Sequence, residues 1–220
     1  MLFDALYTVS SHILEPPEVL LDLEEVIPEP GKILTLPKLT QLASVLECDF
    51  SWDEDFYLLY QYNSDKNNNA ALNLVENLLE AICVSEEFPT LLLVSGKVSH
   101  DNTTEDVVFG AFIANTTHDG TEIQPKPQED QNSTILFQLS PVHDIFRGNV
   151  GRAGWSLVNE ELCFGERDCG VALVFAKDLK EAKVVHNLNG NQKAVYEPSE
   201  WRGTWSTNFE VKSIEVWTDS

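Results

Sequence analysis

Two cysteines have the type and spacing that could support chemistry. Cys163 and Cys169 lie six positions apart, on either side of a predicted turn. A reactive thiol needs a lowered pKa, which a nearby positive charge or a helix N-terminus can provide. Arg167 could supply that charge, but Glu166 and Asp168 flank it and oppose its effect. The pair is therefore a candidate for peroxide-sensing chemistry, and the alternative is a pair of inert thiols.

Glu215 is a second candidate for chemistry. It lies in the segment 209–217 (FEVKSIEVW), whose aromatic and β-branched residues predict a central strand. The apolar residues change phase midway, so either both faces are covered or a bulge lies near Ser213. Burying a carboxylate costs free energy unless it is paired or hydrogen-bonded. Glu215 could thus be held by Arg152, Lys212 or backbone amides, or it could act as a catalytic acid.

The histidines and cysteines form no recognisable metal motif. Five histidines are scattered without an HxH or HExxH pair, and four cysteines lack CxxC spacing. We therefore expect no metal site and no cofactor. Whether the protein is an enzyme stays open, although these candidates favour a non-enzymatic role.

A partner-binding site is predicted in the long loop 187–208. Trp201 and Arg202 are adjacent there, and both residue types are enriched at the centres of protein interfaces. Loops held by a rigid scaffold often carry binding residues. The alternative is that Trp201 anchors the loop by packing against the domain.

Net charge limits the possible partners. Thirty-six acidic residues against fourteen basic ones give a net charge of −22 at pH 7. Such a surface repels phosphate backbones and anionic membranes, which argues against nucleic-acid binding. The charge suits either a basic patch on a protein partner or solubility alone. The oligomeric state does not follow from it.

The chain shows no feature that predicts membrane insertion. It contains no apolar run of 18 residues, so we expect no transmembrane helix. The first residues lack the basic region and the small-residue cleavage site of a signal peptide. We therefore expect a cytoplasmic location, in which the cysteines stay reduced.

Apolar periodicity predicts the elements that position these residues. Helical spacing indicates a short helix from residue 37 and a longer amphipathic one over 71–82. Strands are predicted at 56–60, 90–95, 106–114, 134–139, 154–158, 161–164, 171–175, 182–185 and 209–217. Between them we expect a mobile loop over 115–133 and a turn-rich connection over 143–151. Gly110, inside a strand, marks a bulge or the close approach of another backbone.

These elements predict an α+β fold. Helices gather in the first half of the sequence, and the long polar loops suit antiparallel pairing. We expect a two-sheet antiparallel β-sandwich flanked by helices that are mostly N-terminal. Residues 1–35 are predicted to form an acidic N-terminal extension packed on the domain, and residues 36–220 to form the domain itself.

The order of the motifs resembles the TLDc domain of the oxidation resistance proteins. The resemblance rests on FGAF at 109–112, where the family has a glycine in the same strand, and on FEVKSIEVW at 209–217. The entry segment, with DFYLLYQYNSD followed by a helix and PTLLLVSG, is also similar. The match spans about residues 36–217. A GTGE-like turn is replaced by residues 130–133, and a glycine-rich run keeps only Gly165 and Gly170, which is typical of a divergent member.

The resemblance implies both a fold and a function. The family's fold is a sandwich of two antiparallel sheets bordered by helices. Its members are associated with protection against oxidative stress, and several bind the vacuolar-type proton ATPase and promote its disassembly or regulate it. We therefore expect a non-enzymatic TLDc-like interaction protein. The partners that the family implies are subunits of the vacuolar-type ATPase. The alternative is a stress-response enzyme that uses a reactive cysteine or a buried glutamate.

Overall fold

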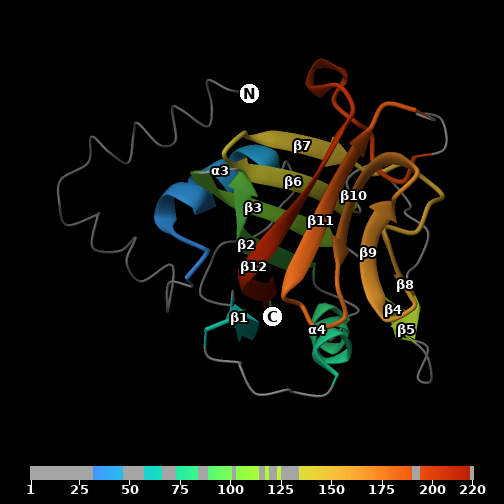
Figure 1. Ribbon diagram of the computed structural model, residues 1–220. Helices are drawn as coiled ribbons and strands as arrows, with labels where there is room; N and C mark the ends of the chain where they lie inside the picture. The colour runs from blue at the N-terminus through green and yellow to red at the C-terminus, as the bar shows by residue number, and fades with distance from the viewer. Residues whose placement is uncertain are drawn as a thin grey trace, which may run out of the picture.

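Antiparallel β-structure makes up most of the described chain, with few helices (Figure 1). The computed structural model describes residues 32–46, 57–65, 73–83, 89–100, 103–113, 117–118, 123–124, 134–189 and 194–218. The helices are α3 (Leu36–Val45), α4 (Leu74–Ile82) and the short 3-10 helix η2 (Glu200–Arg202). The strands are β1 (Tyr57–Asn63), β2 (Thr90–His100), β3 (Thr103–Ile113), β4 (Thr117–His118), β5 (Ile123–Gln124), β6 (Thr134–Ser140), β7 (Asp144–Arg147), β8 (Trp155–Val158), β9 (Glu161–Glu166), β10 (Cys169–Phe175), β11 (Glu181–Asn187) and β12 (Trp205–Thr218).

Strand β12 lies at the centre of the sheet. Within the described ranges, ten strands join one sheet in the order β7-β6-β3-β2-β12-β11-β10-β9-β8, and β1 also pairs with β12. One side of β12 pairs with β2 from Glu210 to Thr218. Its other side pairs with β11 over 205–210 and with β1 over 213–218. The register shifts between Val211 and Ser213, which confirms the irregularity predicted near Ser213.

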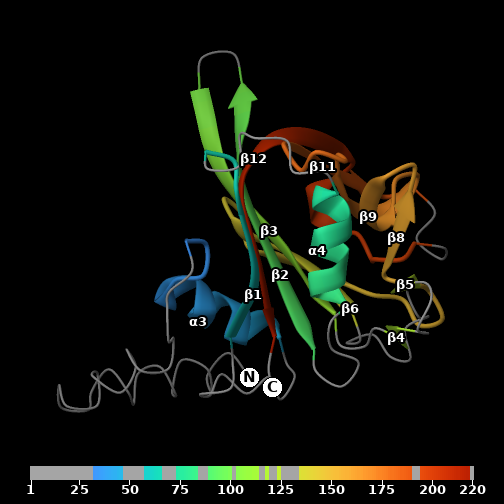
Figure 2. The same cartoon turned by 90° about the horizontal axis from the view of Figure 1, so that it is seen from below.

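The shift in β12 divides the sheet into two wings. A bulge bends a strand and increases its twist, so the two halves of β12 can belong to opposite wings. One wing holds β1, β2, β3, β6 and β7, and the other holds β8 to β11. Helix α4 lies between the wings, and α3 covers the outer face of the first (Figure 2). The predicted antiparallel, strand-rich fold is confirmed, but one continuous sheet takes the place of two separate sheets.

The middle strands of the first wing, β2, β3 and β6, are buried on both faces along most of their length. Leu92 and Val94 of β2 belong to the large cluster between the wings, whereas Leu91 and Leu93 belong to a second cluster under α3. Successive side chains of a strand point to opposite faces, so a strand covered on both sides has a continuous apolar run. This double burial explains the sequence TLLLV. The second cluster also includes Ile33, Leu34, Leu42, Phe112, Ile135, Phe137 and Trp217.

Two strand pairs differ from the sequence prediction. The expected turn-rich connection over 143–151 contains β7, which pairs with β6. The sequence did not predict this strand, because four residues are too few to show a period. The expected loop over 115–133 contains the two-residue strands β4 and β5, which pair with each other, and the rest of it lies outside the described residues. Of the predicted extension 1–35, residues 1–31 lie outside them as well, whereas Ile33 and Leu34 are buried.

Gly110 confirms the predicted close approach of another backbone and supports a first prediction. A Cβ at this position would lie 2.5 Å from the carbonyl oxygen of Leu92 and would also meet the ring of Phe137. Because the neighbouring strand cannot move without breaking its pairing, we expect Gly110→Ala to lower the free energy of unfolding by about 1–3 kcal/mol. Urea denaturation measures this value. Thr104→Ser, on the exposed end of the same strand, should change it by less than about 0.5 kcal/mol, and equal effects would contradict the argument.

Candidate functional site

Glu215 is fully buried in β12, with 0% of its surface exposed. Its Oε1 accepts a hydrogen bond from the backbone amide of Ile33 at 2.9 Å. Its Oε2 accepts one from the amide of Leu34 at 3.1 Å and one from the indole Nε1 of Trp217 at 3.2 Å. Nearby in α3, burial lowers the pKa of Lys38, and the negative charge of Glu215 partly opposes this effect.

These contacts are those of a structural carboxylate. Three donors surround it, and two of them are backbone amides, which is one of the partner types that the sequence left open. Hydrogen bonds of this kind offset the cost of removing a charge from water. They also join residues 181 and 182 positions apart. Glu215 therefore fixes the segment before α3 onto the central strand.

The Glu215 contacts generate a second prediction. In Glu215→Gln an amide group replaces one oxygen, and in either orientation its NH₂ faces a backbone or indole N–H. Since a buried donor without an acceptor costs about 1–3 kcal/mol, we expect the free energy of unfolding at pH 7 to fall by about that amount or more. Glu210→Gln is the matched control, because Glu210 is exposed on the same strand and should change stability by less than about 0.5 kcal/mol. Equal denaturation midpoints for the two variants would contradict the assignment.

The two candidate cysteines lie in environments that oppose thiolate formation. Cys163 is buried in β9, where its thiol donates to the carbonyl of Gly165 at 3.2 Å. Burial raises the pKa of Cys163 to about 11, although Arg167 partly opposes this. Burial also raises the pKa of Cys169, and its hydrogen bond to Glu166 adds to the effect. Both groups are thus thiols at neutral pH, which are weak nucleophiles.

The structure does not pair the two cysteines with each other. In the β9–β10 hairpin, Cys163 lies opposite Val174 and Cys169 lies opposite Glu166. Arg167, the cation that could have lowered the pKa of a thiol, forms an ion pair with Glu161. The charge that a reactive thiol would need is therefore largely compensated by a carboxylate.

Trp201 and Arg202 are adjacent in η2 but point in different directions. Trp201 is 70% exposed, whereas the Arg202 side chain is only 12% exposed. The Nη1 of Arg202 donates to Oε1 of Gln138 at 2.6 Å and lies 3.6 Å from Oδ2 of Asp144. The guanidinium also lies over two rings, 4.6 Å from the centroid of Trp205 and 5.6 Å from that of Trp201. Arg202 is thus an internal support and Trp201 an outward-facing side chain.

His186 connects both ends of the loop that carries Trp201. Ser199 donates its backbone N–H to Nε2 of His186 at 3.0 Å, so Nδ1 carries the proton and donates to the carbonyl of Gly203 at 2.6 Å. The imidazole is fully buried and stacks on Trp205 with a centroid distance of 5.5 Å. The neutral ring therefore closes the loop from inside.

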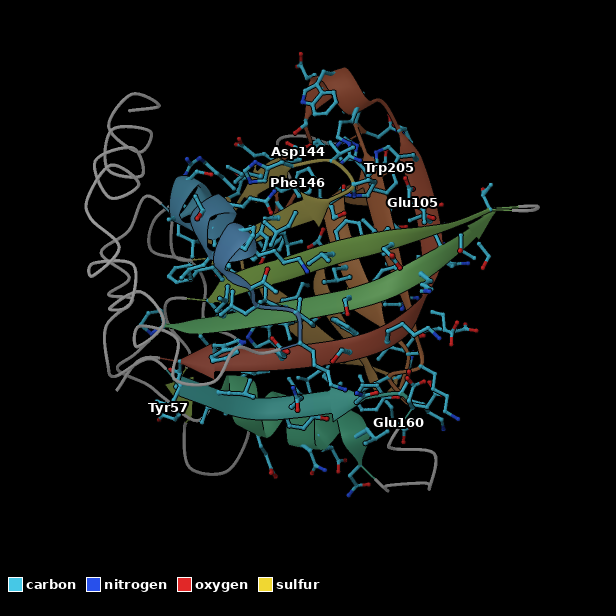
Figure 3. All side chains as sticks on the ribbon, turned by 90° about the vertical axis from the view of Figure 1, so that its left-hand side faces the viewer. Tyr57, Glu105, Asp144, Phe146, Glu160 and Trp205 are labelled. Atoms are coloured by element: carbon cyan, nitrogen blue, oxygen red, sulfur yellow. The ribbon has the colours of Figure 1, made fainter. Side chains whose placement is uncertain are left out.

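Polar and aromatic residues from four separate regions build this support. Ser199 donates its hydroxyl to Oδ1 of Asp144 at 2.9 Å, and Phe146 packs edge-on against His186. Figure 3 shows Asp144, Phe146 and Trp205 close together, at the end of the molecule away from α4. We call the residues that support the loop the loop frame. Its members are Gln138, Asp144, His186, Ser199, Arg202 and Trp205.

The loop frame contains the residue types of a catalytic triad without its connections. The Ser199 hydroxyl donates to Asp144 directly, and Nε2 of His186 accepts from the Ser199 backbone. A triad instead needs the histidine to accept the hydroxyl proton. This arrangement therefore holds a loop and does not activate a nucleophile.

Sequence reasoning missed four members of the frame: Gln138, Asp144, His186 and Ser199. A signal was present in two of them, because Gln138 interrupts the apolar strand TILFQL and His186 lies within the strand EAKVVHN. A polar residue in a buried strand needs a hydrogen-bonding partner. Those partners lie up to 64 positions away, and no local pattern identifies them.

The neutral state of His186 generates a third prediction. Burial lowers its pKa and Arg202 adds to this, while the bond to Gly203 and the charge of Asp144 oppose it. The unfolded chain therefore binds a proton more readily, so the stabilisation is complete above the unfolded value of about 6.5 and is lost as pH falls below it. Between pH 7.5 and 5.5 we expect the free energy of unfolding of the wild type to fall by about 1 kcal/mol more than that of His186→Gln. Urea denaturation at the two pH values measures this difference.

The exposed His143 provides the matched control. His143→Gln should keep the wild-type dependence on pH, since its ring closes no loop. If His186→Gln does not fold, NMR titration of the wild-type ring gives the same answer. A His186 pKa at or above 6.5 would contradict the prediction.

Within the described part of the chain, no three His, Cys, Asp or Glu side chains gather in a way that could hold a metal ion. Among the helices of that same part, none is long and apolar enough to cross a membrane.

Comparisons with known proteins agree with the order of the motifs. A family model described as the TLDc domain matches residues 27–219. "Restriction of telomere capping protein 5" of Leptosphaeria maculans is 28% identical over an alignment that covers 93% of this chain and 40% of that protein. The protein of the same name from Pyricularia oryzae is 28% identical, covering 58% of this chain and 23% of its own length. The chain thus spans less than half the length of these relatives. Since the family model covers nearly the whole sequence, the chain belongs to the TLDc domain family.

Proposed function

We propose that this TLDc protein is a non-enzymatic binding protein of the cytoplasm that supports resistance to oxidative stress and regulates a vacuolar-type proton ATPase by docking on it. The observation that carries the binding role is Trp201, an exposed aromatic residue on a loop whose supporting side chains are buried. Trp is the residue type most enriched at interface hot spots, together with Tyr and Arg. A rigid scaffold that presents it in water is typical of a binding protein.

The environments of the candidate catalytic residues support binding over catalysis. The oxygens of Glu215 are occupied by three donors from the protein itself. The pKa of Cys163 and that of Cys169 are both raised. A nucleophile or a general base needs a free lone pair within reach of a substrate. The hydrogen bonds of these three side chains are made to other groups of the protein.

Charge supports a protein partner over a nucleic acid. The name of the two relatives refers to restriction of telomere capping. A net charge of −22 opposes contact with a phosphate backbone. We therefore propose that the chain does not contact telomeric DNA directly and that it acts by binding a protein with a basic surface.

Binding to the proton pump is a fourth prediction. The purified chain, immobilised on a biosensor, should bind purified vacuolar-type ATPase saturably, and added chain should lower ATP-driven proton pumping in vesicles. The affinity should fall as salt rises from 50 to 500 mM, because screening weakens attraction between an acidic and a basic surface. An unrelated folded protein of similar net charge is the control for non-specific attraction. Binding equal to that control, with no change in pumping, would reject the pump as the partner.

A further inference from the structure

We infer that the loop 199–204 is the contact site, and that Trp201 inserts into an apolar pocket bordered by lysine or arginine side chains on a partner protein. The inference rests on the proposed function, since it names the site and the chemistry of the partner. Its support comes from three properties of the loop: exposure, rigidity and charge.

Exposure distinguishes Trp201 from the other tryptophans of the described part. Trp155 and Trp217 are buried, and Trp205 stacks on His186 inside the loop frame. Trp201 is instead 70% exposed, more than any other exposed large hydrophobic residue there. The guanidinium of Arg202 lies over the Trp201 ring, but this contact leaves 70% of the residue exposed, so packing within the domain does not account for the whole ring. Burying an aromatic side chain in a partner would remove about 150–250 Å² of surface from water.

Rigidity makes the exposed ring an efficient anchor. Ser199 and Gly203 are both hydrogen-bonded to His186, and the amide of Arg202 donates to the carbonyl of Ser199 at 3.1 Å. Thr204 accepts from the amide of Leu188 at 3.2 Å. The loop projects beyond the sheet, seen in dark red at the top of Figure 1. A loop that is ordered before binding loses little conformational entropy on association.

Charge identifies the kind of pocket that fits. Glu197 and Glu200 are exposed on the approach to Trp201. Within residues 197–204 the one cation is Arg202, which is directed inward and lies 3.6 Å from Asp144. The outer surface of the loop therefore combines an apolar ring with negative charge. A pocket with an apolar floor and a cationic rim complements it, and a cation can also stack on the free face of the indole.

Site-specific crosslinking tests the contact without assuming who the partner is. The photoreactive residue p-benzoylphenylalanine would replace Trp201 in one protein and Val158 in another, and each would be irradiated in cell extract. Val158 is the matched control, because it is 56% exposed and lies on a different part of the surface, in β8. We expect position 201 to give at least about tenfold more crosslinked product than position 158. An excess of unlabelled wild-type protein should suppress this product. The crosslinked peptide of the partner should carry Lys or Arg beside apolar residues.

Affinity measurements on that partner complete the test. A hot-spot residue contributes about 2 kcal/mol or more, so Trp201→Ala should weaken binding about 30-fold while leaving the thermal midpoint unchanged. Trp201→Phe should lose less, and Val158→Ala should lose less than twofold. Equal crosslinking at positions 201 and 158, an acidic contact peptide, or full affinity of Trp201→Ala would each overturn the inference.

The same experiment separates the inference from the proposed function. A crosslinked pump subunit would support both. Another protein that meets the criteria would reject the pump while supporting the contact site. Pump binding that survives Trp201→Ala would support the function and reject the site.

Discussion

The hydrogen bonds of Glu215 are the constraint on which the rest of the structure depends. A fully buried carboxylate must be surrounded by donors, and two of the three donors here are the backbone amides of Ile33 and Leu34. The chain before α3 therefore has to cross the central strand at one defined place. That crossing brings α3 over the outer face of the first wing and completes the second core cluster. A change at Glu215 would thus disturb the packing of a whole layer, although only one side chain changes.

The central strand links this packing to the loop that carries Trp201. The second half of β12 lies between β1 and β2 and is buried on both faces. Its first half turns into the other wing, and its first residue, Trp205, lies opposite His186 on β11. The rest of the loop frame contacts that pair: Arg202 stacks on Trp205 and donates a hydrogen bond to Gln138 of β6. The strand therefore builds the core at one end and supports Trp201 at the other.

Much of the fold could be predicted from local patterns. Apolar runs such as TLLLV gave the buried strands, and the phase change in FEVKSIEVW indicated the irregularity of β12, because these features depend on residues a few positions apart. The joining of the wings into one sheet could not be predicted, since it depends on a 14-residue strand that pairs with three neighbours, β1, β2 and β11. β7 was missed because four residues carry too little periodicity.

The site was harder to predict than the fold. The partners of Glu215 lie more than 180 positions away, and the loop frame draws on β6, β7, β11 and the residues around η2. The sequence placed Trp201 and Arg202 together as one pair. In a 3-10 helix adjacent residues point about 120° apart, so one faces water and the other faces the frame. Only the surrounding strands determine which residue takes which direction.

Amide hydrogen exchange followed by NMR tests this account most directly. The amides of Ile33 and Leu34 donate to Glu215, and the amide of Ser199 donates to His186. If the buried carboxylate fixes the fold and the frame holds the loop, these three amides should exchange slowly, with Ile33 and Leu34 as protected as the centre of β2. Rapid exchange at Ile33 and Leu34 would show that Glu215 does not hold this segment. Rapid exchange at Ser199 would show that the loop is not ordered in advance of binding.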